Sequence, residues 1–456
     1  DLKNFDISIK LSLEGIGAVL RWDDGYTVVN SIVPGGAAAR QGKLKTDDRI
    51  IAVAQGEKAF ESVIDMRLNN VVQLIRGKRG TKVGLQILRK TKDGFDTLKI
   101  VIVRDKILLK DGEAQSSIFE QPPAGENKNK QEPLRIGVIK LPSFYVDFND
   151  RRKNPKRYKS SSRDVKAHLK KFVDENVDGV ILDLRNNGGG GLDEAINMAG
   201  LFIGLNPVVI VRQSGGRRVT VHRSRERAVY TGPLVIMLNR YSASASEILA
   251  GAMHDFQRAL LVGDKTTFGK GTVQNIFQLP EGYGALKVTI AQFYRVSGWS
   301  TQNRGVETSI VLPSLNNARE IGESTLDNAL PWRSIDQVSY HPKGNFKTVL
   351  PVLKKLSLKR VKDSEYFQQI DEDVQEFLTS IKPLKYTSIL KMQEDDSRRK
   401  AQRELELSNA TKKETGEDSA EEVESPEENK EIQADDYINE SMAILADYIN
   451  LQQKTE

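Results

Sequence analysis

The fold is decided by the stretch GVILDLRNNGGGG, residues 179–191, in which an apolar run ends in a polar turn and several glycines. An apolar run of this length, rich in Val, Ile and Leu, is typical of a strand buried on both faces. A helical segment follows at 193–203, and further apolar strands are expected at 207–211 and 233–238. Strands that alternate with helices predict an α/β layered fold.

Bulk composition limits the classes of protein to consider. The 456 residues allow two or three domains, and 38% hydrophobic with 29% charged residues suits a soluble globular protein. No apolar run approaches the roughly 18 residues of a membrane span. The net charge is +6, and the basic residues are interleaved with acidic ones, which favours an ordinary solvated surface over a nucleic-acid-binding surface. Only 151–163 is strongly basic, and we expect an exposed loop there.

Cysteine is absent, which excludes a disulfide framework, a thiol nucleophile and a cysteine zinc site. The sequence opens on Asp1 without a methionine or a signal-peptide pattern, so we expect a fragment or processed form of a longer protein. Residues 1–13 are then the remnant of a preceding region.

Residues 14–104 are expected to form a small β-rich module. A Gly-containing loop leads into a strand, further strands and a turn follow, and apolar residues at helical spacing over 63–75 predict one amphipathic helix. This order of elements resembles a PDZ domain, although Asp47-Asp48 stands where such domains carry Gly-Asp. The alternative is a β module that only packs.

The PDZ resemblance implies a peptide-binding groove. In such a domain the N–H groups of the Gly-containing loop hold the C-terminal carboxylate of a peptide, which adds as a strand beside the helix. The residues implied here are Gly15, Ile16, Gly17 and Ala18 in the loop, and Val71 and Val72 on the helix.

Shifts in composition mark the other boundaries. The polar stretch 105–133 is expected to be a linker, 134–340 the α/β catalytic domain, and 341–456 a helical C-terminal domain that closes with an amphipathic helix at 437–451. Within it, 414–432 is rich in acids and is expected to be a disordered insertion.

A run of small residues, Ser242-Ala243-Ser244-Ala245-Ser246, leads from an expected strand straight into a helix. A nucleophile at such a junction is exposed, and N–H groups near a helix N-terminus can stabilise a developing negative charge. The alternative is structural, with Ser246 as the helix cap and Glu247 in the first turn.

Lys270 lies between two glycines and is flanked by apolar and β-branched residues. Burial in a dry pocket lowers the pKa of an amine, which then accepts a proton from a serine hydroxyl near neutral pH. A histidine is the alternative base, but His254 comes ten residues after Ser244, apparently on the same helix. The other histidines, in segments without a chemical pattern, are His168, His222 and His341.

The glycines at 188–190 supply the third component of the candidate site. Glycine lets a backbone approach closely, so a free N–H in this loop can form half of an oxyanion hole. A phosphate site is the alternative, but the loop lacks the Gly-Lys-Ser/Thr ending of phosphate-binding loops.

The chemistry-bearing segments together resemble the C-terminal processing peptidases. They are RNNGGG at 185–190, SASASE at 242–247, FGKGTVQ at 268–274 and FYRVSG at 293–298. With the PDZ-like module and the helical tail, the likeness covers nearly the whole chain and is greatest to the bacterial periplasmic, tail-specific members. The sequence departs from the family at 264–267, which lengthens the serine-to-lysine spacing by one residue, at Trp299 and at 307–309.

The resemblance implies a crotonase- or ClpP-like β-spiral protease core, with no metal, nucleotide or other cofactor. The catalytic residues that it implies are Ser244 as nucleophile, Lys270 as general base and Gln274 as the residue that orients the lysine. The oxyanion hole that it implies consists of Gly188, Gly189 and Ala245. Because of the longer spacing, Ser242 and Ser246 stay open as alternative nucleophiles.

The leading interpretation is therefore a serine endopeptidase that recognises apolar C-terminal tails of protein substrates and cleaves upstream by a Ser–Lys mechanism. The resemblance implies a periplasmic or cell-envelope location with an export signal outside this sequence, and it leaves room for an adaptor protein. A non-catalytic PDZ-type peptide-binding chaperone is the alternative, and the complete Ser244, Lys270 and Gln274 set argues against it. A hydrolase of small acyl substrates is a further alternative, which the PDZ-like module argues against.

Overall fold

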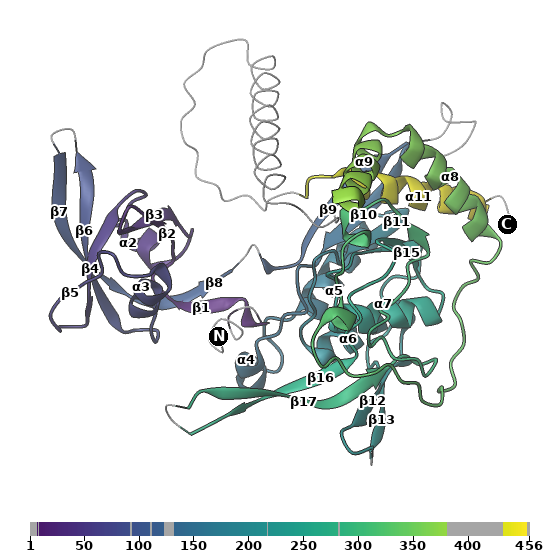
Figure 1. Ribbon diagram of the computed structural model, residues 1–456, viewed down its shortest axis with the longest axis horizontal. Coiled ribbons are helices and arrows are strands. Elements are labelled where there is room, and N and C mark those ends of the chain that lie inside the picture. The colour runs from purple at the N-terminus through teal and green to yellow at the C-terminus, as the bar shows by residue number, and fades with distance from the viewer. Residues whose placement is uncertain are drawn as a thin grey trace, which may run out of the picture.

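The computed structural model describes residues 7, 9–91, 94–109, 112–122, 132–216, 218–280, 283–380 and 432–453. A small β-rich domain and a larger α/β domain are joined by a two-stranded ribbon (Figure 1). The ribbon consists of β1 (Ser12–Gly15) and β8 (Asp105–Leu108), which pair antiparallel.

The small domain is a curved sheet with two helices. Its strands are β2 (Ala18–Asp23), β3 (Tyr26–Ile32), β4 (Arg49–Gln55), β6 (Lys82–Thr91) and β7 (Gly94–Val103), hydrogen-bonded in that order, with β5 (Glu61–Ser62) paired to β4. Its helices are α2 (Ala37–Gln41) and α3 (Leu68–Ile75). The strand β2 lies at one edge of the sheet, and α3 packs against it.

The helix predicted over 63–75 is shorter than expected, since α3 begins only at Leu68. Asp65 has a φ of 59°, a left-handed conformation that a right-handed helix cannot contain. The Met66 N–H donates to the Val63 carbonyl at 3.2 Å and closes a turn there. The apolar spacing continues through this turn, so the sequence pattern alone did not reveal it.

The larger domain is built on a six-stranded sheet with the order β18-β15-β14-β11-β10-β9. Its strands are β9 (Gln115–Gln121), β10 (Leu134–Lys140), β11 (Gly179–Asp183), β14 (Leu234–Leu238), β15 (Leu260–Gly263) and β18 (Ile310–Val311). Only β9 pairs antiparallel to its neighbour among these strands. The predicted α/β fold is confirmed.

Helices cover both faces of this sheet. Along β11, Val180 and Leu182 belong to one hydrophobic cluster and Ile181 to another, as the period of two in a strand requires. The helices of the first cluster are α5 (Ser161–Asp174), α6 (Leu192–Ile203) and α7 (Ala245–Asp255). Those of the second are α8 (Val349–Asp363), α9 (Glu365–Ser380) and α11 (Asp436–Gln453). Burial on both sides explains why the strands read as continuous apolar runs.

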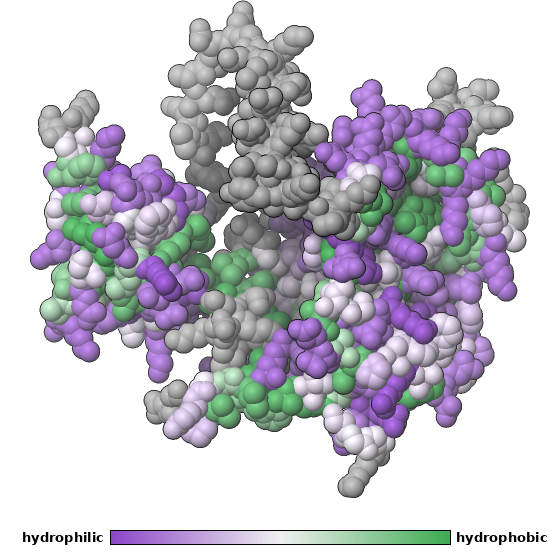
Figure 2. All heavy atoms as spheres, in the orientation of Figure 1, coloured by the Kyte–Doolittle hydropathy of each residue, from purple (hydrophilic) through white to green (hydrophobic). Residues whose placement is uncertain are grey.

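A second, antiparallel sheet has the order β13-β12-β17-β16. Its strands are β12 (Pro207–Gln213), β13 (Val219–Arg223), β16 (Thr272–Gln278) and β17 (Ala285–Tyr294). On the long β16–β17 hairpin, Phe277 pairs with Leu286, and both side chains are exposed. Figure 2 shows hydrophobic side chains gathered at this hairpin. The short helical turns of this domain are α4 (Phe148–Lys153), η2 (Leu315–Asn317) and η3 (Glu323–Thr325).

Two expectations about connecting segments differ from the structure. The described part of 105–133 is not a plain linker, because it contains β8 and β9, and Ile107 of β8 is buried. The basic segment 151–163 is not simply a loop, because it begins within α4, which Asp147 caps by accepting N–H bonds from the first turn.

The C-terminal segment returns to the main sheet. The closing helix predicted at 437–451 is confirmed as α11. Of the acidic stretch 414–432, only Ile432 lies within the described residues; it is buried, and its N–H donates to Ser117 Oγ at 3.0 Å. In the described ranges, no helix combines the length and apolar character that crossing a bilayer demands.

Candidate active site

The candidate nucleophile lies where two neighbouring parallel strands end. Because β11 and β14 are adjacent and parallel, the segments that follow them meet at the same edge of the sheet. The segment after β14 carries Ser242–Ser246, and the segment after β11 carries the glycine run 188–191. The Ala243 N–H donates to the Asn187 carbonyl at 3.0 Å and joins the two segments directly.

Ser244 is the N-cap of α7 and has an unusual backbone conformation, with φ 57° and ψ −109°. A non-glycine residue adopts such a conformation at a cost of roughly 1–3 kcal/mol, so the surroundings must enforce it. The Ser244 N–H donates to Glu247 Oε2 at 2.8 Å, and this bond holds the turn. The alternative in which Ser246 caps the helix is wrong, because α7 already begins at Ala245.

The serine hydroxyls of this run differ in what they contact. Ser242 and Ser246 are fully buried, whereas Ser244 is half-buried. Ser242 Oγ donates to the Leu184 carbonyl at 2.9 Å, and Ser246 Oγ donates to the Asn187 carbonyl at 2.8 Å. Both buried hydroxyls therefore hold the loop after β11 in place, and Ser244 is the member of the run that solvent reaches.

Lys270 lies on the loop between β15 and β16. Its side chain is half-buried, and Nζ donates to Gln274 Oε1 at 3.3 Å. Burial lowers the pKa of the amine below its ordinary value of 10.5, and the charge of Lys287 lowers it further, while Glu323 and Glu247 oppose the shift. The pKa shift thus has the direction predicted from the sequence.

Glu247 connects the two halves of the candidate site. Its fully buried carboxylate accepts the Ser244 N–H through Oε2 at 2.8 Å and the Lys270 N–H through the same oxygen at 2.9 Å. Oε1 accepts Thr267 Oγ1 and the Gly269 N–H, both at 2.7 Å. Burial raises the pKa of Glu247 to about 7, and these donors oppose the rise. Sequence reasoning placed Glu247 only in the first helical turn; a Ser followed three residues later by Glu is the capping-box signal for such a contact.

The glycine loop faces the serine at very close range. A Cβ on Gly189, which has a φ of 105°, would lie 2.8 Å from Ser244 Cβ, so only glycine fits there. The Gly189 N–H donates to Asn187 Oδ1 at 2.9 Å, so it can act as one of the oxyanion donors expected from the sequence only by giving up this bond. Gly188 is exposed and faces open space, and the Ala245 N–H is at the helix start, where no intrahelical acceptor exists. These two N–H groups stay as the candidate donors.

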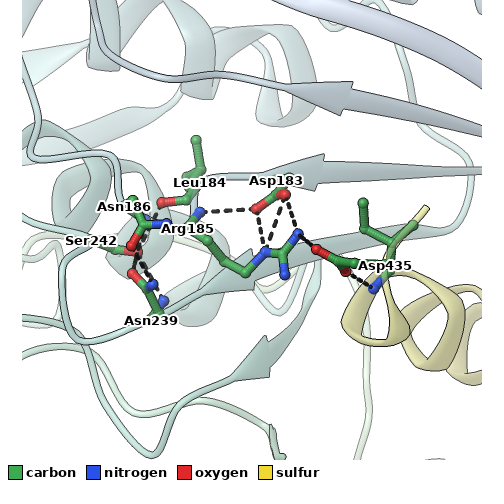
Figure 3. A network of polar contacts seen from close by, with 8 residues as sticks. Asp183, Leu184, Arg185, Asn186, Asn239, Ser242 and Asp435 are labelled. Carbon is green, nitrogen blue, oxygen red and sulfur yellow. Dashed lines mark hydrogen bonds and ion pairs between the residues drawn. The ribbon is translucent and has the colours of Figure 1, made fainter. Parts of the chain in front are cut away.

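A polar network holds the loop after β11 in place (Figure 3). Arg185 binds the buried Asp183, with Nη2 to Oδ2 at 2.7 Å, and its Nη2 also lies 2.9 Å from Asp435 Oδ2. Asn186 and Asn239 exchange two hydrogen bonds, from the Asn186 N–H at 2.9 Å and from Asn239 Nδ2 at 2.8 Å. Sequence reasoning assigned no role to Asp183, Asn239 or Asp435.

The groove of the small domain agrees in part with its predicted residues. Gly17 has a φ of 77°, and a Cβ there would lie 3.0 Å from Gly36 Cα, so the loop requires glycine. Val72 on α3 is half-buried, as a groove wall should be, and Leu68 one turn earlier has the same exposure. Val71, which was predicted to line the groove, is wholly buried in the core of the domain instead. Helical periodicity turns adjacent residues to different sides, so Val71 and Val72 cannot share the wall.

Two of the four histidines, His168 and His254, have hydrogen-bond partners away from Ser244. His168 Nδ1 lies 2.8 Å from Ser116 Oγ, and His254 Nδ1 lies 2.7 Å from Arg295 Nη2. Within the described part of the chain, the hydrogen bonds join no histidine to Ser244. The same residues contain no group of three or more His, Asp or Glu side chains that could hold a metal ion.

Protein-family profiles match the chain in the order expected from the sequence. They are the PDZ domain at 6–88, peptidase family S41 at 135–312 and the C-terminal domain of tail-specific protease at 316–450. The PDZ resemblance of the N-terminal module is thereby confirmed.

Curated relatives carry matching names. The tail-specific protease of Haemophilus influenzae is 40% identical over 82% of this chain, which spans 51% of that protein. The carboxy-terminal processing protease CtpA of Bacillus subtilis is 30% identical over 82% of this chain, which spans 70% of it. A crystal structure of the PDZ domain of the carboxy-terminal protease from Vibrio cholerae in complex with peptide is 49% identical; the match covers 21% of this chain and 98% of that one, with a TM-score of 0.21. The chain therefore belongs to peptidase family S41, among the C-terminal processing, tail-specific serine proteases.

Proposed function

We propose that this chain is a serine endopeptidase with Ser244 as nucleophile and Lys270 as general base. The observation that carries the proposal is the carboxylate of Glu247, which binds the N–H groups of both residues. One buried group thus sets the position of nucleophile and base together. The binding of Ser242 and Ser246 to backbone carbonyls supports Ser244 over its neighbours.

The proposed reaction is a Ser–Lys mechanism, which is supported by the binding of the Ser244 and Lys270 backbone N–H groups to one carboxylate. Neutral Lys270 Nζ takes the Ser244 hydroxyl proton as Oγ attacks the scissile carbonyl, and Gln274 Oε1 orients the amine. The tetrahedral oxyanion accepts hydrogen bonds from the N–H groups of Gly188 and Ala245, and Ala245 lies at the positive N-terminal end of α7. Lys270 then donates its proton to the leaving amine, which leaves an acyl-enzyme for water to hydrolyse with the same base. The lowered pKa of Lys270 supports this role, because only a neutral amine can accept the proton.

Substrate recognition is proposed to occur in the small domain, with a protein C-terminus as ligand. The strand β2 is an edge strand beside α3, so a peptide can add to the sheet there. The loop Gly15–Ala18 would bind the terminal carboxylate, and the half-buried Leu68 and Val72 would contact apolar tail residues. Leu68 and Val72 are four residues apart on α3, so their side chains lie on the same face and form a single apolar wall, which supports selection of apolar tails.

Three further features of the proposed function rest on the family resemblance. They are a periplasmic or cell-envelope location, physiological substrates that are proteins with apolar C-termini, and delivery of some substrates by an adaptor protein. These properties belong to the whole protein, and the chain spans about half of the Haemophilus relative.

The test is cleavage of a reporter protein that ends in an apolar tail. Wild type should cleave it, and Ser244→Ala should not, because Oγ is needed for the acyl-enzyme. The variant should stay folded and bind tails as wild type does, with a stability loss of about 1 kcal/mol because Ser244 is the N-cap of α7. Amidation of the reporter C-terminus, or a terminal Asp, should slow wild-type cleavage at sites well upstream. Full activity of Ser244→Ala, or equal rates for all tails, would contradict the corresponding half of the proposal.

A further inference from the structure

We propose that Asp435, at the start of the C-terminal helix α11, is a positioning residue for the loop that supplies the oxyanion hole. The inference rests on the proposed function and extends it, because Asp435 comes from outside the S41 match at 135–312. The carboxylate acts through Arg185, not on the reacting atoms. The C-terminal helix is thereby a working part of the active site as well as a cover for the sheet.

The helix α11 is seated on β11 at the end far from the active site. A Cβ on Gly179, the first residue of β11, would lie 2.7 Å from Leu445 Cδ2 and 3.3 Å from Ile449 Cδ1. The glycine therefore makes room for side chains of α11, which packs on β11 and β14. This contact fixes where the helix lies along the strand.

The same register brings the helix start to the active-site end of β11. From Gly179 to Arg185 the extended chain covers roughly 20 Å. Back to Asp435, the helix covers about 15 Å from Leu445 and about 21 Å from Ile449. A helix seated at Gly179 by these two residues therefore places Asp435 near the active-site end of β11, and Figure 3 shows it beside Arg185.

The Asp435 carboxylate has two partners that belong to different parts of the molecule. Oδ2 lies 2.9 Å from Arg185 Nη2, and Oδ1 accepts the Ile438 N–H at 2.8 Å as the N-cap of α11. The Tyr437 ring lies 5.6 Å from the same guanidinium. Asp435 thus ties the beginning of the helix to the arginine, whose side chain is only 17% exposed.

Arg185 is the first residue of the loop whose shape the chemistry needs. Its own N–H also binds Asp183 Oδ1 at 2.9 Å, and the next residue, Asn186, has a φ of 61° and is held by Asn239. Gly188 follows two residues later. Displacement of a catalytic group by about 1 Å costs roughly 10²-fold in rate. A shift of the Arg185 guanidinium is therefore expected to displace the Gly188 N–H and to lower the rate of the chemical step.

The same helix offers a matched control. Asp447 Oδ2 accepts Arg360 Nη1 at 2.7 Å and joins α11 to α8. The Asp447 side chain is 9% exposed against 49% for Asp435. Loss of the Asp447 charge is therefore expected to lower the stability of the protein at least as much as loss of the Asp435 charge. The Asp447 variant thus shows what loosening of α11 alone does to the activity.

The experiment compares Asp435→Asn with Asp447→Asn in the full chain. Asparagine is a good N-cap, so Asp435→Asn retains the helix start and removes the charge that faces Arg185. The measurements are kcat and KM on the apolar-tailed reporter, the rate at which a fluorophosphonate probe modifies Ser244, and the melting temperature. Asp435→Asn should lower kcat and the modification rate roughly 10- to 100-fold with KM within about twofold. Asp447→Asn should lower the melting temperature and leave kcat within about twofold of wild type.

Equal kcat and modification rates in the two variants, or an effect of Asp435→Asn on KM alone, would overturn the inference. If Asp435→Asn does not fold, Asp435→Ser replaces it with the same expectation, because serine is also a good N-cap. The two proposals fail in different ways. An inactive wild type refutes the proposed function, whereas an active wild type with a fully active Asp435→Asn refutes only the role of Asp435.

Discussion

The active site and the peptide groove of the small domain are built in opposite ways. At the active site, a strained serine backbone and a carboxylate that solvent does not reach fix the backbones of the proposed reacting residues. In the groove, the wall formed by Leu68 and Val72 is half-exposed, and the domain reaches the protease through the β1–β8 ribbon. We infer that changes at the first region act mainly on kcat and are severe, and that changes at the second act mainly on KM and are graded.

Among changes outside the proposed nucleophile and base, the largest effect should come from loss of the charge on Glu247. In Glu247→Gln an N–H₂ group replaces one acceptor among donors from Ser244, Thr267, Gly269 and Lys270, so the turn that positions both reacting residues must shift. We expect kcat to fall roughly 10²- to 10³-fold with little change in KM, measured on the reporter.

The control for Glu247→Gln is a buried carboxylate of the small domain. Asp48 is 1% exposed and accepts Arg89 Nε at 2.7 Å and the Lys45 N–H at 2.8 Å. Asp48→Asn should destabilise the small domain and leave kcat near wild type. If both variants lost kcat to the same extent, the contrast between the two regions would not hold.

The next largest effect is expected from a change of pH, which should alter the cleavage rate. Lys270 must be neutral to act as base, and its lowered pKa still requires a rise of rate with pH, about tenfold per pH unit below that pKa. Below about pH 7, Glu247 also takes up a proton and loses an acceptor, so the rate should fall further as the pH is lowered. A rate that falls as the pH rises from about 6 to about 8 would contradict both assignments.

Protonation of Glu247 at low pH does not itself destabilise the fold. The folded-state pKa of Glu247, about 7, is raised above the ordinary 4.5, so the folded protein binds this proton more tightly than the unfolded chain does. By linkage, this group makes the free energy of unfolding fall as pH rises from about 4.5 to about 7. Its contribution to stability is therefore greatest where activity is expected to be lowest, and melting temperatures across the pH range check the separation.

The smallest effect on cleavage is expected from Val72→Ala on α3, and Val71→Ala at the adjacent position is the comparison. Val72→Ala removes groove wall, so KM for apolar tails should rise about three- to tenfold with kcat unchanged. Val71→Ala leaves a cavity in the core and should destabilise the small domain by roughly 1–3 kcal/mol. Reporter kinetics and thermal unfolding check the pair, and the groove assignment is wrong if Val71→Ala changes KM while Val72→Ala does not.

Much of the fold was predictable because burial leaves a local signature. The main strands are continuous apolar runs, and the closing helix has helical spacing over 437–451. The turn at Asp65 and the strand β9 were missed, because the first depends on one left-handed residue and the second on pairing with β10. Polar segments of this kind take their structure from partners that the local sequence does not display.

The candidate nucleophile and base, Ser244 and Lys270, were proposed from their neighbours in the sequence, and their roles stay predictions. The same reasoning did not foresee that Asn187 binds the Gly189 N–H. It also missed the double role of Glu247 and the pairing of Arg185 with Asp435, because contacts between distant segments appear only after the sheet has formed. Local sequence thus suggests candidate reacting groups more readily than the distant residues that hold them in place.

The most direct test of the central claim, that Lys270 is the base, is the cleavage rate of Lys270→Arg. Arginine retains the positive charge but does not deprotonate at working pH. We expect Lys270→Arg to be as inactive as Lys270→Ala, roughly 10⁴-fold or more below wild type, with His254→Ala and His222→Ala active as controls. Substantial cleavage by Lys270→Arg, or loss of activity in either histidine variant, would contradict the Ser–Lys account.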